Sequence, residues 1–309
     1  MSTLSQTLTA YRLYARAEGK SPRTVEWITS CVQHFIEFLG GDQELVAVSA
    51  EDLRRFIRAL QDAHKYRKHP YSKPQPDRLS PQSIETYARA IRAFFGHLFK
   101  EEFIGVNPMQ NVRMPRVPQK VVPTFSERDL MKLISQPDKH TDVGFRDYNL
   151  FLTFGDTAAR VSEVVNLTVD DVDFENGYLK VLGKGGRERY IPFGQKLAKV
   201  LLKYKMKYRP EPVATDRFFL TAGGRPMSPG RIGKIFHEYG RKAGLKRCYP
   251  HKLRHTSSVM FLRNGGDPFS LQKKLGHSSL QMTRHYSNLA DSDVRAAQLK
   301  YSPVDRMDI

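Results

Sequence analysis

The chain is poor in cysteine and contains no long apolar run. Cys31 and Cys248 are the only cysteines among 309 residues, and they lie in different halves, so no disulfide framework is implied. No apolar segment reaches the length of a bilayer-spanning helix, and the polar N-terminus from Met1 to Thr9 lacks a signal-peptide core. We therefore expect a cytoplasmic protein that does not contact a membrane.

Acidic residues are scarce relative to basic ones. The chain has 32 aspartates and glutamates against 50 lysines and arginines, which gives a formal net charge of +18 and a pI near 9.9. Such an excess favours a polyanionic partner, and nucleic acid fits better than a membrane surface. Charge alone would also suit a ribosomal or chromatin protein, so it indicates the partner and not the chemistry.

Two kinds of cofactor motif are missing. The segment Gly183-Lys-Gly-Gly lacks the spacing of a phosphate-binding P-loop. Asp170, Asp171 and Asp173 stand at a strand start and a turn without a partner carboxylate motif, so a solvated turn is favoured over a nuclease metal cluster. The sequence therefore predicts neither a cofactor nor a metal.

Length and proline distribution divide the chain near residue 115. Its 309 residues exceed one typical domain. Residues 114–123 carry three prolines and little helical pattern, which is typical of a linker. We expect a helical domain at 1–112, a linker at 113–123, and a second domain with a C-terminal tail at 124–309.

Capping signals predict that the first domain is all helical. Ser-Pro pairs at residues 21–22 and 80–81 suit a cap followed by the first helical turn, and apolar residues at helical spacing follow each pair. Another capped helix begins near Ser49, and a less clearly marked one occupies residues 3–18. Four amphipathic helices are therefore expected.

The second domain has a mixed pattern. Ser126 and Asp129 form a capping box before a helix, residues 145–155 suggest a buried helix, and 161–167 a short one. Three short strands with tight turns are expected at 169–174, 178–182 and 188–192. Further helices are expected near 194–206, 228–243, 251–264, 267–275 and 279–289. The predicted fold class is mainly α with a small antiparallel β-sheet.

A set of basic residues and a late tyrosine indicates phosphodiester chemistry. His251 and Arg254 share the run Pro250-His-Lys-Leu-Arg, and His277 and Tyr286 follow at Leu275-Gly-His and Thr283-Arg-His-Tyr, while Arg160 lies upstream. Arginine forks bind phosphate oxygens bidentately and stay charged at any working pH. Tyrosine is a possible covalent nucleophile, and histidine can move its protons.

In order and spacing, these motifs resemble the tyrosine recombinases, the integrase family that includes phage integrases and Xer proteins. The family's β-turn lysine matches Lys184. The resemblance covers nearly the whole chain and implies a helical core-binding (SAM-like) domain that clasps one face of the duplex, followed by an α+β catalytic domain. One position departs from the family: Ala158 replaces the glycine that usually precedes the first arginine, and glycine permits conformations that alanine resists.

The resemblance implies a site-specific DNA recombinase that cleaves and rejoins strands through a 3′-phosphotyrosine, in integration, excision or resolution. Arg160 and Arg254 would hold the non-bridging oxygens of the scissile phosphate and stabilise the charge that develops there. His251 lies three residues before Arg254 and so shares its helix face, where it can act as acid or base. Tyr286 would attack the phosphorus.

The remaining roles also follow from that resemblance. His277 would donate to a phosphate oxygen, and Lys184 would protonate the leaving 5′ oxygen. The partner would be double-stranded DNA with inverted-repeat core sites, bound by a homotetramer, with an accessory protein possible. The tail from Asp291 to Ile309 would dock on a neighbouring copy or pack on its own domain.

Two further basic features are candidate DNA contacts. Lys65, Arg67 and Lys68 lie in a loop that mixes positive charge with tyrosine and proline, and could follow phosphates or be a solvated loop. Arg89 and Arg92 lie on the helix that begins at Ser80-Pro81, away from its apolar face, and could enter the major groove or face solvent.

Three alternatives stay open. Cys248, His251 and His255 could bind zinc with His277, although that would take His251 away from the phosphate. A type IB topoisomerase shares the cleavage chemistry but acts as a monomer on any sequence. A non-catalytic, sequence-specific DNA-binding protein could keep the fold, although the intact Arg160, Arg254 and Tyr286 argue against it.

Overall fold

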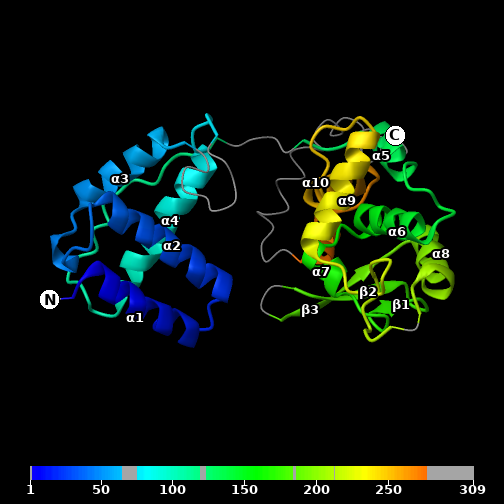
Figure 1. Ribbon diagram of the computed structural model, residues 1–309, viewed down its shortest axis with the longest axis horizontal. Helices are drawn as coiled ribbons and strands as arrows, with labels where there is room; N and C mark the ends of the chain where they lie inside the picture. Colours follow the sequence, from blue (N-terminus) through cyan, green and yellow to red (C-terminus); the bar gives the residue numbers. More distant parts are fainter. Residues whose placement is uncertain (1, 65–74, 119–122, 184–185, 212, 277–309) are drawn as a thin grey trace, which may run out of the picture. The chain divides into compact units, whose positions relative to one another are not determined.

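The computed structural model describes residues 2–64, 75–118, 123–183, 186–211 and 213–276. The chain divides into two compact units, residues 1–120 and 121–309, which we call unit 1 and unit 2 (Figure 1). The division falls within the expected linker, and the roles expected of the two parts stay predictions. No helix in the described ranges has both the length and the apolar character needed to cross a membrane.

The described residues of unit 1 form four α-helices, each with a side-chain cap, and a short 3-10 helix at Leu45–Ala47. Their bounds are α1 Leu4–Ala17, α2 Pro22–Phe38, α3 Ala50–Asp62 and α4 Pro81–Lys100. The hydroxyls of Ser21, Ser49 and Ser80 each accept a hydrogen bond from a backbone N–H in the first turn of the following helix, which satisfies donors that the helix leaves open. The four expected helices are therefore confirmed within one or two residues.

The core of unit 1 contains a cluster of aromatic rings among aliphatic side chains. Phe35, Phe94 and Phe95 have no exposed surface, and Tyr11 has almost none. Their rings meet edge to face, for example Tyr11 on Phe94 with centroids 5.6 Å apart, an arrangement that aromatic quadrupoles favour. The apolar periodicity of α2 and α4 thus closes a single helical core.

Unit 2 combines helices with one three-stranded antiparallel sheet, β1-β2-β3. The strands are β1 Val172–Asp173, β2 Tyr178–Leu182 and β3 Glu188–Pro192. Leu179 of β2 pairs with Ile191 of β3. The fold class predicted from the sequence, mainly α with a small antiparallel sheet, is confirmed.

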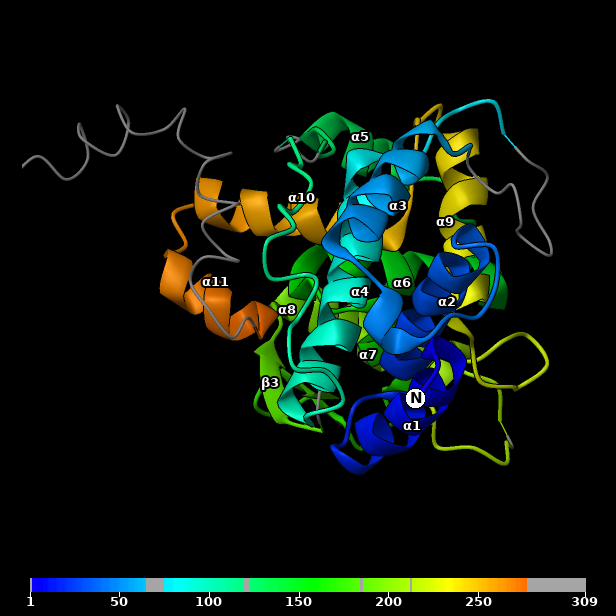
Figure 2. The same cartoon turned by 90° about the vertical axis from the view of Figure 1, so that its left-hand side faces the viewer.

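The helices of unit 2 surround a core that includes the inner face of this sheet (Figure 1). Their bounds are α5 Glu127–Ile134, α6 Asp142–Thr157, α7 Val161–Asn166, α8 Gln195–Lys203, a π-helical turn Tyr204–Tyr208, α9 Pro229–Lys242, α10 Pro250–Arg263 and α11 Pro268–Leu275. Figure 2 shows α10 and α11 next to each other, where Val259 of α10 and Leu271 of α11 share a small apolar cluster.

Two boundaries differ from the expectation. The first strand was predicted at 169–174, but β1 is only Val172–Asp173. The carboxylate of Asp171 accepts from the backbone N–H of Thr168, and the hydroxyl of Thr168 accepts from the N–H of Asp171, so a side-chain turn occupies the predicted strand start. The helix predicted at 194–206 ends at Lys203 and continues as the π-helical turn. The helix expected at 279–289 lies outside the described residues.

Candidate active site

Arg254 is buried in unit 2 and is held by backbone carbonyls. It lies in α10, which begins at Pro250, and only 3% of its surface is exposed. One terminal nitrogen donates to the carbonyl of Ala158, and the other donates to that of Leu275 at 3.0 Å. Both acceptors are neutral, so these bonds orient the guanidinium without neutralising its charge. A fixed cation of this kind suits a phosphate whose charge grows during reaction.

The carbonyl of Ala158 reaches Arg254 because the chain makes a left-handed turn there. Ala158 follows α6 as its C-terminal cap with φ 53° and ψ 26°, a conformation that costs a residue with a Cβ about 1–2 kcal/mol. This is the position where the sequence departs from the family's glycine. The turn is therefore retained with alanine, whose buried methyl packs with Leu271 and Leu275 of α11.

Arg160 is positioned by a buried carboxylate, that of Glu163. The backbone N–H of Arg160 donates to Glu163 at 2.7 Å, and its guanidinium donates to the same carboxylate at 2.9 Å. The side chain of Glu163 is 2% exposed, whereas that of Arg160 is 36% exposed. Arg160 thus has one side fixed to protein and another open to solvent, which leaves hydrogen-bond donors for a ligand.

The carboxylate of Glu163 also binds a second arginine, Arg189 of β3. Two nitrogens of Arg189 donate to its two oxygens at 2.7 and 2.9 Å, the bidentate geometry that gives strong charge-assisted bonds. Burial raises the pKa of Glu163, but the bonds from Arg189 and Arg160 outweigh burial and lower its pKa overall. Glu163 therefore stays ionised and joins α7 to β3.

Arg189 was not identified from the sequence. Its Nε donates to the carbonyl of Lys274 at 3.2 Å, and a Cβ added at Gly276 would lie 2.9 Å from its Cδ. The one available signal was its register: Arg189 lies two residues before the fully buried Ile191, so it points to the inner face of the sheet. An arginine on that face needs a buried partner.

Several bonds fix the C-terminal end of α11. The carbonyls of Lys274 and Leu275 accept from Arg189 and Arg254, respectively. The ammonium of Lys274 donates to the carbonyl of Asp156 at 2.7 Å, which ties α11 to the end of α6, and burial lowers its pKa. Gly276 then takes a left-handed conformation with φ 63°. The turn at Gly276 is therefore well anchored.

His251 is under the electrostatic influence of both candidate arginines. Partial burial is the largest cause that lowers the pKa of His251 below the ordinary 6.5, and the positive charges of Arg254 and Arg160 lower it further. Its Nε2 lies 3.0 Å from Nε2 of His255, so one ring donates and the other accepts. His251 is therefore neutral at pH 7 and can accept a proton.

Lys184, His277 and Tyr286 lie outside the described residues. The strand pair that leads to Lys184 is described, and Gly183 donates to the carbonyl of Arg187 at 2.8 Å. Lys180, another lysine of this hairpin, forms an ion pair with Glu188 at 3.1 Å. Lys180 is thus paired within the sheet, and the role of Lys184 stays a prediction.

The zinc alternative finds no support in the surroundings of Cys248. Burial raises the pKa of this thiol to about 11, as is usual for a cysteine in apolar surroundings. Cys248 instead packs in the apolar core of unit 2. Among the described residues, the side chains close enough to share a metal are Glu18, His97 and Glu101 of unit 1.

The candidate DNA contacts of unit 1 have partners within the protein. Arg89 donates to Glu85 through Nε at 3.0 Å and through a terminal nitrogen at 2.7 Å. Arg92 donates to the carbonyl of Val112 at 2.6 Å. Their contact with DNA stays a prediction. Lys65, Arg67 and Lys68 lie outside the described residues.

The chain is similar to known proteins in sequence and in structure. Residues 123–293 match the Phage integrase family. The chain is 30% identical to tyrosine recombinase XerC of Oceanobacillus iheyensis over 294 residues, 93% of this chain and 92% of that protein. It is also 30% identical to tyrosine recombinase XerD of Staphylococcus epidermidis over 228 residues, 72% of this chain and 77% of that protein.

Two solved structures share its fold. The XerH site-specific recombinase bound to palindromic difH substrate superposes with a TM-score of 0.74 at 21% identity, covering 96% of this chain and 84% of that one. A lambda integrase dimer bound to a COC' core site superposes with a TM-score of 0.71 at 19% identity, covering 92% and 95%. These likenesses show that the chain shares the fold of these two recombinases.

Proposed function

The chain belongs to the phage integrase family of tyrosine recombinases, and from this premise we propose which of its residues break and rejoin DNA. It is a site-specific DNA recombinase that works through a 3′-phosphotyrosine intermediate. The proposed catalytic residues contact the scissile phosphate, the attacking oxygen or the leaving oxygen: Arg160, Lys184, His251, Arg254, His277 and Tyr286.

The observation that carries this proposal is that Arg160 and Arg254 are both held in place around the turn at Ala158. Arg254 binds the carbonyl of Ala158, and Arg160, two residues later, binds Glu163. Both charges act on His251. Two preorganised guanidinium groups beside a neutral histidine suit a pentavalent phosphate with two charged oxygens.

The cleavage step follows from these positions. The phenolic oxygen of Tyr286 attacks the phosphorus, and the bond from phosphorus to the 5′ oxygen breaks. His251, neutral at pH 7, accepts the phenolic proton, and Lys184 gives a proton to the leaving 5′ oxygen. The phosphotyrosine is itself a phosphodiester, so a 5′-hydroxyl of a second DNA strand can reverse the step. These proton transfers are carried by side chains of the protein.

DNA and further copies of the chain are the partners that this function requires. The related structures, palindromic difH bound by XerH and a lambda integrase dimer on a core site, support a symmetric site with one copy on each half. We propose a tetramer on two inverted-repeat core sites for strand exchange. An accessory protein stays a possibility raised by the sequence alone.

Covalent capture tests the proposal. The protein is incubated in EDTA with fragmented DNA that includes the region around its own gene, quenched with SDS, and the attached DNA is sequenced, with Tyr286→Phe as the control. Attachment at one short inverted repeat, absent in the variant, is the expected result. Attachment scattered over all DNA would favour topoisomerase activity. Tight binding to a defined site without attachment would contradict the proposed chemistry.

A further inference from the structure

A second histidine of α10 lies against the proposed base. His251 and His255 are four residues apart, so their side chains share one face of the helix. The ring centroids are 4.4 Å apart with an interplanar angle of 75°, and the two Nε2 atoms are 3.0 Å apart. That distance is typical of a hydrogen bond between ring nitrogens. The cleavage step proposed above uses His251 and assigns no role to His255.

The bond between the two rings decides whether His251 can act as a base. Two neutral imidazoles can form this bond in two ways, because each neutral ring carries one N–H. If His251 donates from Nε2, its Nδ1 has a free electron pair and can accept the phenolic proton. If His255 donates instead, Nδ1 of His251 already carries a hydrogen and cannot accept another. A basic Nδ1 on His251 therefore requires that His255 presents Nε2 as an acceptor.

The helix is anchored on both sides of His255. Arg254, the residue before it, donates to two backbone carbonyls from other parts of unit 2. The hydroxyl of Thr256, the residue after it, accepts from the backbone N–H of Phe125 at 2.9 Å and donates to a carbonyl one turn earlier at 2.9 Å. His251 is exposed and His255 is half-buried, so the outer ring is the one that a substrate reaches. Anchoring of this kind keeps the second ring in place behind the first.

A proton on His251 is opposed by its surroundings. Partial burial, and after it the positive charges of Arg254 on the same helix and Arg160 at the start of α7, lower the pKa of this histidine. The ring that accepts the phenolic proton would therefore hold it at a cost. A second imidazole at 3.0 Å allows the positive charge to move one ring away, and the transfer needs little driving force because the two groups are chemically alike.

We propose that His255 is the positioning residue of His251: it accepts the hydrogen bond from Nε2 of His251, and it takes over that hydrogen when Nδ1 receives the phenolic proton of Tyr286. The proposal rests on the proposed function, in which His251 is the base. The O–H bond of Tyr286 breaks as the Nδ1–H bond of His251 forms. The Nε2–H bond of His251 breaks as that of His255 forms. One proton leaves the tyrosine and one is gained by His255, and rejoining of the strands reverses both transfers.

Single-turnover cleavage of site DNA at saturating concentration tests the proposal. His255→Gln places an amide oxygen near the position of Nε2, so it can accept the bond but cannot carry the proton, and His255→Leu can do neither. We expect the rate to fall about 100-fold in His255→Leu, a loss typical of proton transfer, and His255→Gln to lie between this variant and the unmodified chain. His140→Leu removes an exposed histidine before α6 and should leave the rate unchanged. The dissociation constant for site DNA, measured with Tyr286→Phe added to each chain, should not change.

A second measurement needs no cleavage. ¹⁵N spectra of the full chain without DNA report which ring nitrogen of each histidine carries hydrogen. The chain has ten histidines, and the signals of the pair are identified by their loss in His251→Gln and His255→Gln. We expect hydrogen on Nε2 of His251 and a bare Nε2 on His255 in the unmodified chain.

The outcomes distinguish this proposal from the proposed function. The expected order of rates, at equal DNA affinity and with hydrogen on Nε2 of His251, supports the role of His255. An unmodified rate in His255→Leu overturns it, as does hydrogen on Nδ1 of His251 in the unmodified chain. A chain that forms no covalent adduct with any DNA would contradict the proposed function and not the histidine pair, which the ¹⁵N spectra then decide by themselves.

Discussion

The two units differ in how many polar side chains they bury. Among the described residues, unit 1 buries two polar side chains, Thr7 and His97, whereas unit 2 buries twelve. The buried ionisable residues of unit 2 are Arg146, Asp147, Glu163, Arg209, Lys252 and Arg254. Burying a charge costs several kcal/mol unless it is paired and hydrogen-bonded. Unit 2 therefore depends on polar networks for its stability to a degree that unit 1 does not.

The difference in buried polar side chains matches the role expected of each unit. Helices that pack around an apolar core need only amphipathic faces, and unit 1 meets that need. A site that stabilises growing negative charge needs cations fixed in advance and shielded from water, as Arg254 is. Other buried charges in unit 2 are structural: Arg146 pairs with Asp147 at 2.6 Å, and burial raises the pKa of that aspartate despite the pair.

The largest expected effect comes from Glu163→Gln. The change leaves Arg189 and Arg160 without the carboxylate that both bind, and breaking a buried pair costs about 3–5 kcal/mol. We expect about 3, because Arg160 is a third exposed and can turn to water. Chemical unfolding followed by circular dichroism measures the loss of stability. The yield of SDS-resistant adduct measures the loss of DNA cleavage.

Glu188→Gln is the matched control for this change. Its pair with Lys180 is exposed on the same hairpin, with side chains 50% and 40% accessible, so water screens the pair and it contributes little to stability. Equal losses of stability in Glu163→Gln and Glu188→Gln would show that the burial of Glu163 does not determine its contribution.

Arg189→Lys should slow cleavage with little change in DNA affinity. Lysine keeps the charge but cannot make the bidentate pair with Glu163, so the orientation of Arg160 and the end of α11 loosens. A misplacement of about 1 Å at a reacting group can reduce the rate by about 100-fold. Single-turnover cleavage rates and the dissociation constant for site DNA are measured together.

Arg187→Lys, two residues earlier and exposed, serves as the control for Arg189→Lys and should leave the cleavage rate unchanged. Weaker DNA binding by Arg189→Lys at an unaltered cleavage rate would show that Arg189 contacts DNA instead of positioning Arg160.

The stability of unit 1 should fall in mild acid because of His97. Burial lowers the pKa of His97 below its ordinary 6.5, with Glu18 and Glu101 opposing this and Lys20 and Lys100 adding to it. The unfolded chain therefore takes up a proton first as pH falls. The free energy of unfolding should be constant above about pH 6.5 and decrease as pH drops from there through the lowered pKa.

Trp27, the only tryptophan of the chain, lies in α2 and reports on unit 1 alone. Urea unfolding followed by its fluorescence at pH 7.5 and 5.5 measures the effect, and His97→Phe should reduce the difference between the two pH values. A larger difference in that variant would assign the acid sensitivity to other groups.

The smallest effect is expected for Ala158→Gly. Relief of the left-handed conformation gains about 1–2 kcal/mol, while glycine costs about 0.5–1 in unfolded-state entropy and the lost buried methyl costs about 0.8. The changes nearly cancel.

Glu102 of unit 1 has a similar φ of 58° but is exposed, so Glu102→Gly should stabilise more than Ala158→Gly. Thermal unfolding of both variants checks the order, and equal stabilisation by the two changes would show that the methyl of Ala158 contributes nothing.

Sequence patterns predicted unit 1 better than the details of unit 2. Serine caps and apolar spacing located its four helices, because each signal acts within one or two turns. In unit 2 the strand expected from Val169 was shortened by the turn between Thr168 and Asp171. Arg189 escaped notice because its partner Glu163 lies 26 residues away. The pair between Arg160 and Glu163, by contrast, is local, because the two residues are one helical turn apart.

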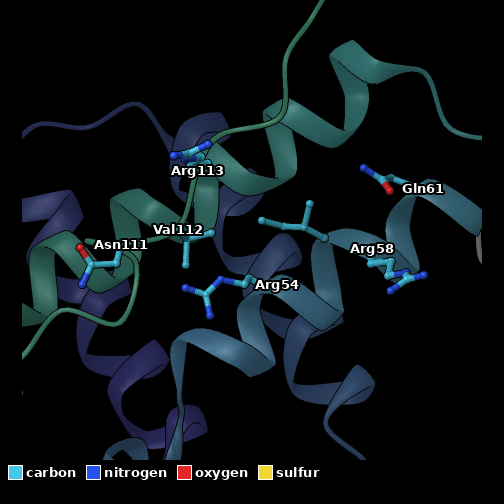
Figure 3. Close-up of a pocket in the computed structure, with 7 residues that line it drawn as sticks. Arg54, Arg58, Gln61, Asn111, Val112 and Arg113 are labelled. Atoms are coloured by element: carbon cyan, nitrogen blue, oxygen red, sulfur yellow. The ribbon is translucent and has the colours of Figure 1, made fainter.

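The sequence by itself determined the helical faces, the sheet, the basic charge and the order of the motifs that identify the family. These features depend on local spacing and on composition, both of which can be read from the sequence without knowing how distant segments pack. Only the tertiary structure decided what holds the site together: a carbonyl at Ala158 that receives Arg254, and a buried carboxylate shared by Arg160 and Arg189. It also brought Arg113, which follows α4, to the groove that Arg54 and Arg58 of α3 line in unit 1 (Figure 3). Such contacts join residues distant in the chain, and their strength comes from burial that only the packed protein provides.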